Sequence, residues 1–129
     1  MRTLHAVVFS VALVMSARAS AGEIKPYTQE QFDQLAAMGK PIVVAVHADW
    51  CPTCKAQKPI IDSLMRAPSY APVTTLIVDF DADKATVRKY KVAMQSTLIA
   101  FRGTKEVDRS VGDTSPGGIE HLVKKTLAD

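Results

Sequence analysis

The chain has 129 residues, with 16 Lys and Arg against 13 Asp and Glu, and 47% of its residues are hydrophobic. That length suits a single globular domain. The modest net charge excludes the strongly basic surface that nucleic-acid binding requires.

The N-terminal segment has the three-part layout of a secretory signal peptide. Arg2 gives it a positive start, residues 4–15 form a short apolar run, and small residues offer cleavage after Ala19 or Ala21. The run is shorter than the about 20 apolar residues that span a membrane, although an uncleaved N-terminal anchor is an alternative. We therefore expect residues 1–21 to be a signal peptide.

Cleavage changes the charge balance of the remaining domain, residues 22–129. Arg2 and Arg18 leave with the signal, so that 14 basic residues face the 13 acidic ones. The basic pI therefore belongs mainly to the export segment, and nothing indicates a nucleic-acid partner. We expect a soluble, exported, periplasmic protein, whose about 110 residues can bury one core without disulfide staples.

In chain order, the domain is expected to alternate strands and helices. Thr28 and Gln31 form a capping-box pattern, and Gly39 ends that first helix. The β-branched run over 42–46 is typical of a strand buried on both faces. The expected elements are a strand over 23–27, a helix over 28–38, a strand over 42–46, a helix over 52–65, a strand over 74–80, a helix over 81–90, strands over 97–101 and 106–111, and a helix from 115. This order predicts an α/β fold with a mixed sheet of four to five strands and helices on both faces.

Apolar positions at helical spacing predict which side chains face the core. The inward set comprises Phe32, Leu35, Ala36, Met38, Ile60, Ile61, Leu64, Met65, Ile119, Leu122, Val123 and Leu127. Residues 66–72, which include two prolines, are expected to form a loop.

The two cysteines of the chain lie in the motif Cys51-Pro52-Thr53-Cys54, between an expected strand and an expected helix. Two thiols at this spacing can close reversibly into a disulfide, which indicates electron exchange with other thiols. The start of a helix favours an anion by about 0.3–1 kcal/mol, so Cys51 is the expected nucleophile. Cys54, on the same helical face, is the expected resolving thiol.

The residues around this motif resemble the thioredoxin-fold family over essentially the whole mature chain. The matching residues are Ala48 to Lys55, Pro59, Val78 to Asp81, Thr97 to Phe101, Val111 and Gly112. The Pro-Thr pair between the cysteines is similar to that of periplasmic reducing thioredoxins. The resemblance implies a thioredoxin-like fold and a thiol–disulfide oxidoreductase, acting as a periplasmic reductant. It also implies protein disulfides as substrates, a membrane thiol-electron donor as partner, and no cofactor beyond the redox-active disulfide. We expect a monomer.

The loop before the expected strand at 97–101 departs from the family pattern. Ser96 stands where the family has a cis-proline, and we expect the Gln95–Ser96 bond to be trans, because a non-proline cis bond costs about 2.5–4 kcal/mol. In the family this loop pairs with the substrate as an added strand, so Gln95, Ser96 and Thr97 are candidate substrate-binding residues. The Ser96 hydroxyl is a candidate donor to a thiolate.

Two further departures lie just before the cysteines. Ala45 replaces a buried aspartate that, in the family, accepts the proton of the resolving cysteine. His47 is either a substitute proton acceptor, since its charge can switch near neutral pH, or a histidine that ends a strand. Trp50 is expected to form a wall of the active site, and Pro52 and Thr53 to tune the dithiol.

Two other functions stay open. Because the family's proline keeps metals away from the sulfurs, Ser96 leaves room for a metal or iron–sulfur site on Cys51, Cys54 and His47. Such a site would be shared between two chains, since zinc takes four ligands and no complete metal site is expected in one chain. The other alternative is a thioredoxin-fold binding protein with little turnover, given Ser96 and Ala45.

Overall fold

The computed structural model describes residues 20–127. The expected signal peptide therefore lies outside the described residues except for positions 20 and 21. Within the described range, no helix is long and apolar enough to cross a membrane.

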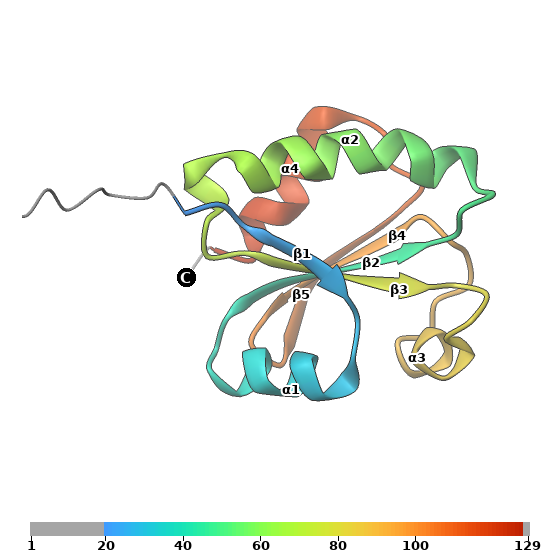
Figure 1. Cartoon of the computed structure of the whole chain (residues 1–129), viewed down its shortest axis with the longest axis horizontal. Coiled ribbons are helices and arrows are strands. Elements are labelled where there is room, and N and C mark those ends of the chain that lie inside the picture. The colour runs from blue at the N-terminus through green and yellow to red at the C-terminus, as the bar shows by residue number, and fades with distance from the viewer. Residues whose placement is uncertain (1–19, 128–129) are drawn as a thin grey trace, which may run out of the picture.

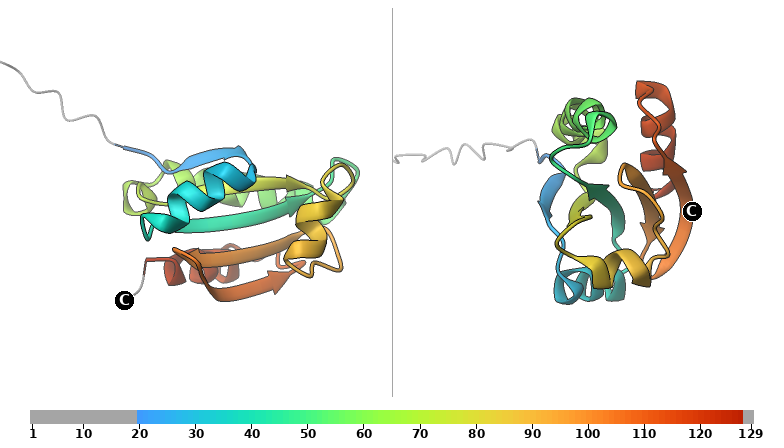
Figure 2. Two further views of the ribbon diagram at one scale, coloured as in Figure 1. Left: turned by 90° about the horizontal axis from the view of Figure 1, so that it is seen from below. Right: turned by 90° about the vertical axis from the view of Figure 1, so that its right-hand side faces the viewer.

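The core of the fold is a five-stranded mixed sheet in the order β1-β3-β2-β4-β5 (Figures 1 and 2). The central strand β2 pairs parallel with β3 and antiparallel with β4. β1 extends the parallel half and β5 the antiparallel half. The strands are β1 (Glu23–Pro26), β2 (Pro41–His47), β3 (Thr74–Asp79), β4 (Thr97–Arg102) and β5 (Lys105–Val111). The predicted α/β fold with a mixed sheet is confirmed, and Pro26 ends an edge strand, where its missing N–H is tolerated.

Four helices cover the two faces of the sheet, as predicted. α2 and α4 lie on one face, and α1 and α3 lie on the other (Figure 1). The helices are α1 (Gln29–Ala37), α2 (Pro52–Arg66), α3 (Lys84–Lys89) and α4 (Pro116–Lys125). The predicted loop over 66–72 contains a short 3₁₀ turn, η1 (Pro68–Tyr70), because Pro68 is already set at a helical φ.

Two side chains predicted to face inward, one near the end of α1 and one near the end of α4, are exposed in the structure. Thr28 caps α1 as predicted, its Oγ1 accepting a hydrogen bond of 3.1 Å from Gln31 N. Gly39 follows with a φ of 67°, a left-handed conformation that ends the helix. Met38 is 63% exposed and Leu127 is 38% exposed, so both predictions of an inward side chain are wrong. Met38 directly follows the last residue of α1 and Leu127 lies two residues beyond the end of α4, so neither continues the inward stripe.

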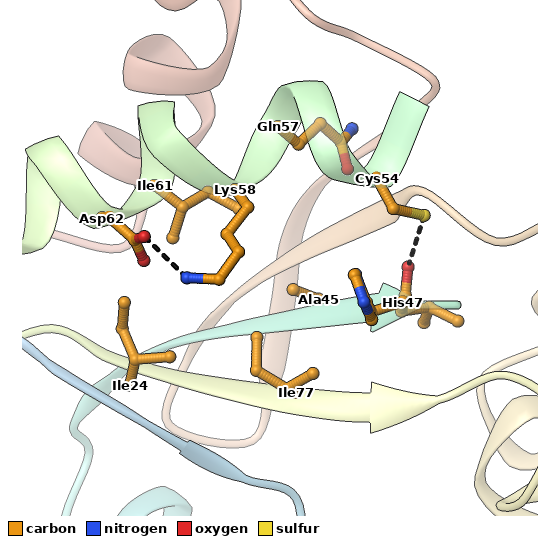
Figure 3. Close-up of a pocket in the computed structure, with 10 residues that line it drawn as sticks. Ile24, Ala45, His47, Cys54, Gln57, Lys58, Ile61, Asp62 and Ile77 are labelled. Atoms are coloured by element: carbon orange, nitrogen blue, oxygen red, sulfur yellow. Dashed lines mark hydrogen bonds and ion pairs between the residues drawn. The ribbon is translucent and has the colours of Figure 1, made fainter. Parts of the chain in front are cut away.

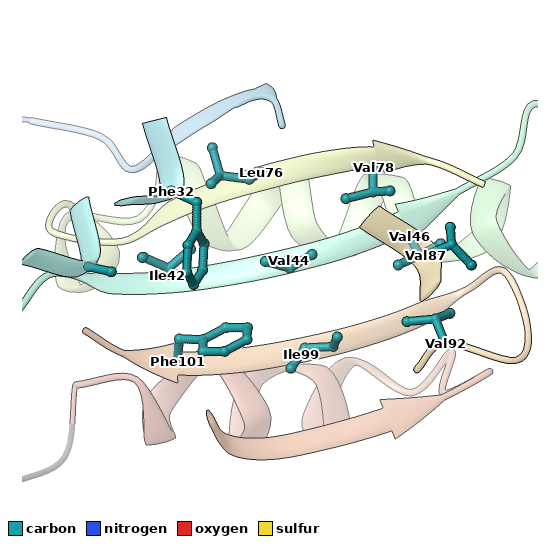
Figure 4. Packing of buried hydrophobic residues seen from close by; sticks show 11 residues of the cluster. Phe32, Ile42, Val44, Val46, Leu76, Val78, Val87, Val92, Ile99 and Phe101 are labelled. Carbon is teal, nitrogen blue, oxygen red and sulfur yellow. The ribbon is translucent and has the colours of Figure 1, made fainter. Parts of the chain in front are cut away.

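Two hydrophobic clusters hold the helices against the sheet. The cluster under α1 and α3 includes Phe32 and Phe101, whose rings meet edge to face at 5.1 Å between centroids (Figure 4). The cluster under α2 and α4 includes Met65, Leu98 and Ile119. Because β2 contributes to both, its five central residues are all buried, which explains its unbroken apolar run.

The chain leaves β2 at His47 and enters α2 at Pro52, so the cysteine motif lies beside the carboxyl ends of the parallel strands β2 and β3. The loop before β4 comes to the same place, since Ser96 N donates a hydrogen bond of 2.8 Å to Val46 O. The fold thus brings the two predicted site segments together.

Candidate active site

Cys51 is the N-cap residue of α2. Its backbone is extended, and its Sγ accepts a hydrogen bond of 3.1 Å from Cys54 N. Pro52 occupies the first helical position, where a missing N–H costs nothing. In most helix caps a side-chain oxygen accepts a hydrogen bond from the unpaired N–H groups at the helix start. Here the Cys51 sulfur takes that place, and these N–H groups stabilise it most when it is a negatively charged thiolate.

The Cys51 thiol is set up to ionise. Burial acts to raise its pKa, but hydrogen bonds from the Cys54 side chain and backbone and from the Gln95 side chain outweigh burial, so the pKa lies below the ordinary value. Cys51 is 1% exposed in this conformation. A partner sulfur therefore reaches it only when the covering side chains move aside.

Cys54 has the opposite character. Burial, followed by the hydrogen bond to Cys51 and the charge on that sulfur, raises the pKa of Cys54 to about 11. Its own thiol points at Val46 O, 4.0 Å away. The two sulfurs are free thiols, so the structure describes the dithiol state. One sulfur is thus prepared as an anion, and its neighbour is kept protonated.

The loop that carries Ser96 packs against both cysteines without a cis bond. The Gln95–Ser96 bond is trans, as predicted, since residues 20–127 contain no cis peptide. Ser96 instead adopts a φ of 61°, which is uncommon for a residue with a Cβ. Its hydroxyl donates to Gln95 O at 2.5 Å, so the expected donation to a thiolate is not seen.

Gln57 is a site residue that sequence reasoning missed. It is 3% exposed, and its Nε2 donates to Ser96 O at 3.1 Å and to Asp113 O at 2.8 Å. Gly112 N also donates to Ser96 O. Both backbone polar groups of Ser96 are therefore engaged inside the protein. The only signal in the sequence was a polar residue on the inward side of α2.

Three further side chains belong to the two segments that meet at the cysteine motif. Trp50 is 57% exposed and its Nε1 donates to Asp81 Oδ2 at 2.6 Å, which holds the ring toward the end of β3; its role as a wall of the active site stays a prediction. Met94, 53% exposed, lies in the loop before β4. Thr97 is buried, and its hydroxyl donates to Met94 O at 2.7 Å, so it shapes that loop from within.

Known proteins share this arrangement. The family model described as Thioredoxin matches residues 23–125. Thioredoxin from Chlamydia trachomatis is 33% identical over 102 residues, which cover 79% of this chain and 97% of that protein. Thioredoxin-1 from Saccharomyces cerevisiae is 33% identical over 96 residues, covering 74% and 90% of the two chains. The crystal structure of Trxlp from Edwardsiella tarda is 40% identical with a TM-score of 0.75, covering 78% of this chain and 98% of that one.

The chain belongs to the thioredoxin family. It is accordingly a thioredoxin-like disulfide oxidoreductase, and thioredoxins work through their own dithiol. Within residues 20–127, no group of three or more His, Cys, Asp or Glu side chains is arranged to hold a metal ion. His47 therefore does not complete a ligand set with the two cysteines inside one described chain.

Ala45 and His47 lie on the side of β2 that faces the helix carrying the cysteines. Both side chains lie on the face of β2 below α2, because alternate residues of a strand share a face. His47 ends β2, and its Nε2 lies 3.0 Å from Asp49 Oδ1. This matches the interpretation of a strand-ending histidine with a hydrogen bond. Its ring also lines a cavity that contains Cys54.

Proposed function

We propose that this protein is an exported thioredoxin that reduces protein disulfides, with Cys51 as nucleophile and Cys54 as resolving thiol. The observation that carries the proposal is the hydrogen bond from Cys54 N to Cys51 Sγ at the start of α2. It supports a thiolate at Cys51, and the thiolate is the form that attacks a disulfide.

The reaction proceeds in two exchanges. The Cys51 thiolate attacks one sulfur of a partner disulfide, forming a mixed disulfide and releasing the other partner sulfur as a thiolate. Cys54 then loses its proton and attacks Cys51 Sγ. A Cys51–Cys54 disulfide forms, the bond to the partner breaks, and the partner leaves as a dithiol. The partner gains two electrons, and the protein loses two.

The surroundings of Cys51 support a protein as substrate. Trp50, directly before the motif, and Met94, in the loop before β4, both offer exposed apolar surface. Pro52 is exposed and Thr53 is half-buried, so both border the approach to the sulfur. Since both backbone groups of Ser96 are engaged, a docked substrate strand would use the Gln95 backbone rather than that of Ser96.

The N-terminal segment supports export to the periplasm, with cleavage after Ala19 or Ala21. The mature protein would act there as a soluble monomer. An oxidising compartment oxidises dithiols, so a reductant there needs renewal by a membrane thiol-electron donor. Mass spectrometry of the protein purified from its native host tests this. A mature N-terminus at Ser20 or Gly22 is expected, and an intact residue 1 would contradict it.

Redox assays test the direction of exchange. Equilibration with glutathione should give a potential near the about −270 mV of thioredoxins, whereas one near about −120 mV would indicate an oxidant. The protein should reduce insulin, a Cys51→Ser variant should not, and a Cys54→Ser variant should trap mixed disulfides. Failure of both reduction and trapping would favour a binding protein with little turnover.

A further inference from the structure

A partly enclosed cavity of about 120 Å³ lies between α2 and the sheet, with Cys54 among its lining residues (Figure 3). Its floor is apolar, because Ala45 and its register partner Ile77 carry no polar atom there. Its rim is polar, with His47 near Cys54 and the Lys58–Asp62 ion pair farther along α2 (Figure 3). A water occupies about 30 Å³ in the liquid, so the cavity has room for several waters with polar partners.

Cys54 needs a proton acceptor during turnover. Its thiol is 3% exposed, and burial raises its pKa to about 11, so few molecules hold it as a thiolate at neutral pH. No carboxylate lies below it at position 45. Asp62 lines the same cavity, but its Oδ2 is held by Lys58 Nζ at 2.7 Å.

His47 carries a nitrogen that can accept a proton. A carboxylate only accepts hydrogen bonds, so the contact between His47 Nε2 and Asp49 Oδ1 places the ring hydrogen on Nε2. The neutral ring then keeps a lone pair on Nδ1. Histidine is the side chain that most often serves as a general acid or base in proteins. Its side chain is 29% exposed, so the proton can pass on to solvent.

We propose that His47 accepts the proton of Cys54 through water in this cavity, with Asp49 as the positioning residue. The inference rests on the proposed function, since it concerns the second exchange at the same dithiol. The Cys54 proton moves to Nδ1 of His47 as the Cys54 sulfur attacks Cys51 Sγ. The sulfur–sulfur bond to the partner breaks, and the imidazolium then releases its proton to the departing thiolate or to solvent.

Charged groups on three elements and in the loop after β2 lie around His47. Asp79 of β3 is its register partner, and Asp49 is its hydrogen-bond partner. Lys25 of β1 lines the hollow on the outer side of His47. Lys58 and Asp62 of α2 line the inner cavity as a neutralised pair. Asp49 and Asp79 thus place carboxylates beside the ring that receives the proton in the proposed transfer.

Rapid mixing of the fully reduced protein with 5,5′-dithiobis(2-nitrobenzoate) separates the two exchanges. Attack by Cys51 releases one coloured thiolate, and attack by Cys54 on the resulting mixed disulfide releases a second. In His47→Asn, the second phase at pH 7 should slow at least about tenfold, and its rate should depend more steeply on pH. The first phase should remain. His121→Asn, at an exposed histidine of α4, is the matched control and should keep both phases.

A rescue variant separates proton transfer from structural damage. Adding Ala45→Asp to His47→Asn places a carboxylate in the cavity and should restore much of the second phase. If His47→Asn does not fold, Asp49→Asn tests the same relay from a fully exposed position and should shift the pH profile of the second phase. Identical second phases in the His47→Asn, Asp49→Asn and His121→Asn variants would overturn the relay alone. A wild-type protein without a first phase would overturn the proposed function and the relay with it.

Discussion

Gln57 Nε2 donates a hydrogen bond of 3.1 Å to the carbonyl oxygen of Ser96, 39 positions along the chain. The same amide nitrogen bonds Asp113 O at 2.8 Å. One buried side chain of α2 therefore ties the loop before β4 and the loop before α4 to the helix that carries both cysteines.

Replacing Gln57 should destabilise the protein. Gln57→Leu keeps the volume of the side chain but leaves the Ser96 and Asp113 carbonyls without this donor, which costs about 1–3 kcal/mol of unfolding free energy. Urea denaturation measures the change. Gln34→Leu, at an exposed glutamine of α1, is the control and should change stability by less than about 0.5 kcal/mol. Equal effects of the two substitutions would show that the tie has no energetic role.

Gln95 should govern the ionisation of the nucleophile. Because the Gln95 side chain helps to lower the pKa of Cys51, Gln95→Ala should raise that pKa and move the alkylation profile of Cys51 to higher pH. Iodoacetamide labelling of a Cys54→Ser background, followed by mass spectrometry, isolates the one thiol. Met94→Ala, in the same loop, should leave the midpoint in place. A midpoint unmoved by Gln95→Ala would remove Gln95 from the site.

The reduced protein should lose stability in alkali through Cys54. The pKa of Cys54 in the folded state is about 11, above the about 8.5 of an unfolded cysteine. A raised pKa contributes stability that is complete below the unfolded value and is lost as pH rises through the folded value. The midpoint temperature of thermal unfolding should therefore fall more steeply between about pH 8.5 and pH 10.5 for the reduced wild type than for Cys54→Ser. This range is about the span between the two pKa values. Parallel curves would refute the assignment.

Trp50 should need Asp81 for efficient exchange with protein substrates. Asp81→Ala removes the acceptor of the Trp50 Nε1 hydrogen bond and frees the indole ring of the residue that precedes Cys51. This exposed bond corresponds to about 0.5–1 kcal/mol, or a two- to fivefold loss in kcat/KM for insulin reduction. Asp33→Ala, on the opposite face in α1, serves as the comparison. Since Trp50 is the one tryptophan of the chain, its fluorescence reports the release of the ring directly.

Features set by neighbours in sequence could be predicted. The cap of α1 at Thr28 and the position of Cys51 at the start of α2 follow from local patterns, and the structure has both. Gln57 could not be assigned, because its acceptors at Ser96 and Asp113 come from distant segments. The cavity behind Cys54 likewise needed the pairing of Ala45 with Ile77, which depends on strand register. Helix caps and the cysteine motif can therefore be predicted from neighbouring residues, whereas hydrogen bonds between distant segments can be assigned only from the folded structure.

The backbone of Ser96 bears on how this protein could be changed by evolution or by design. Proline holds φ near −65° and has no N–H, whereas Ser96 has a φ of 61° and donates to Val46 O. Proline therefore does not fit this position unless the segment around it is rebuilt. Glycine, which accepts positive φ freely, is the replacement that this position tolerates best. A designed return to proline at position 96 would therefore have to change the neighbouring backbone as well.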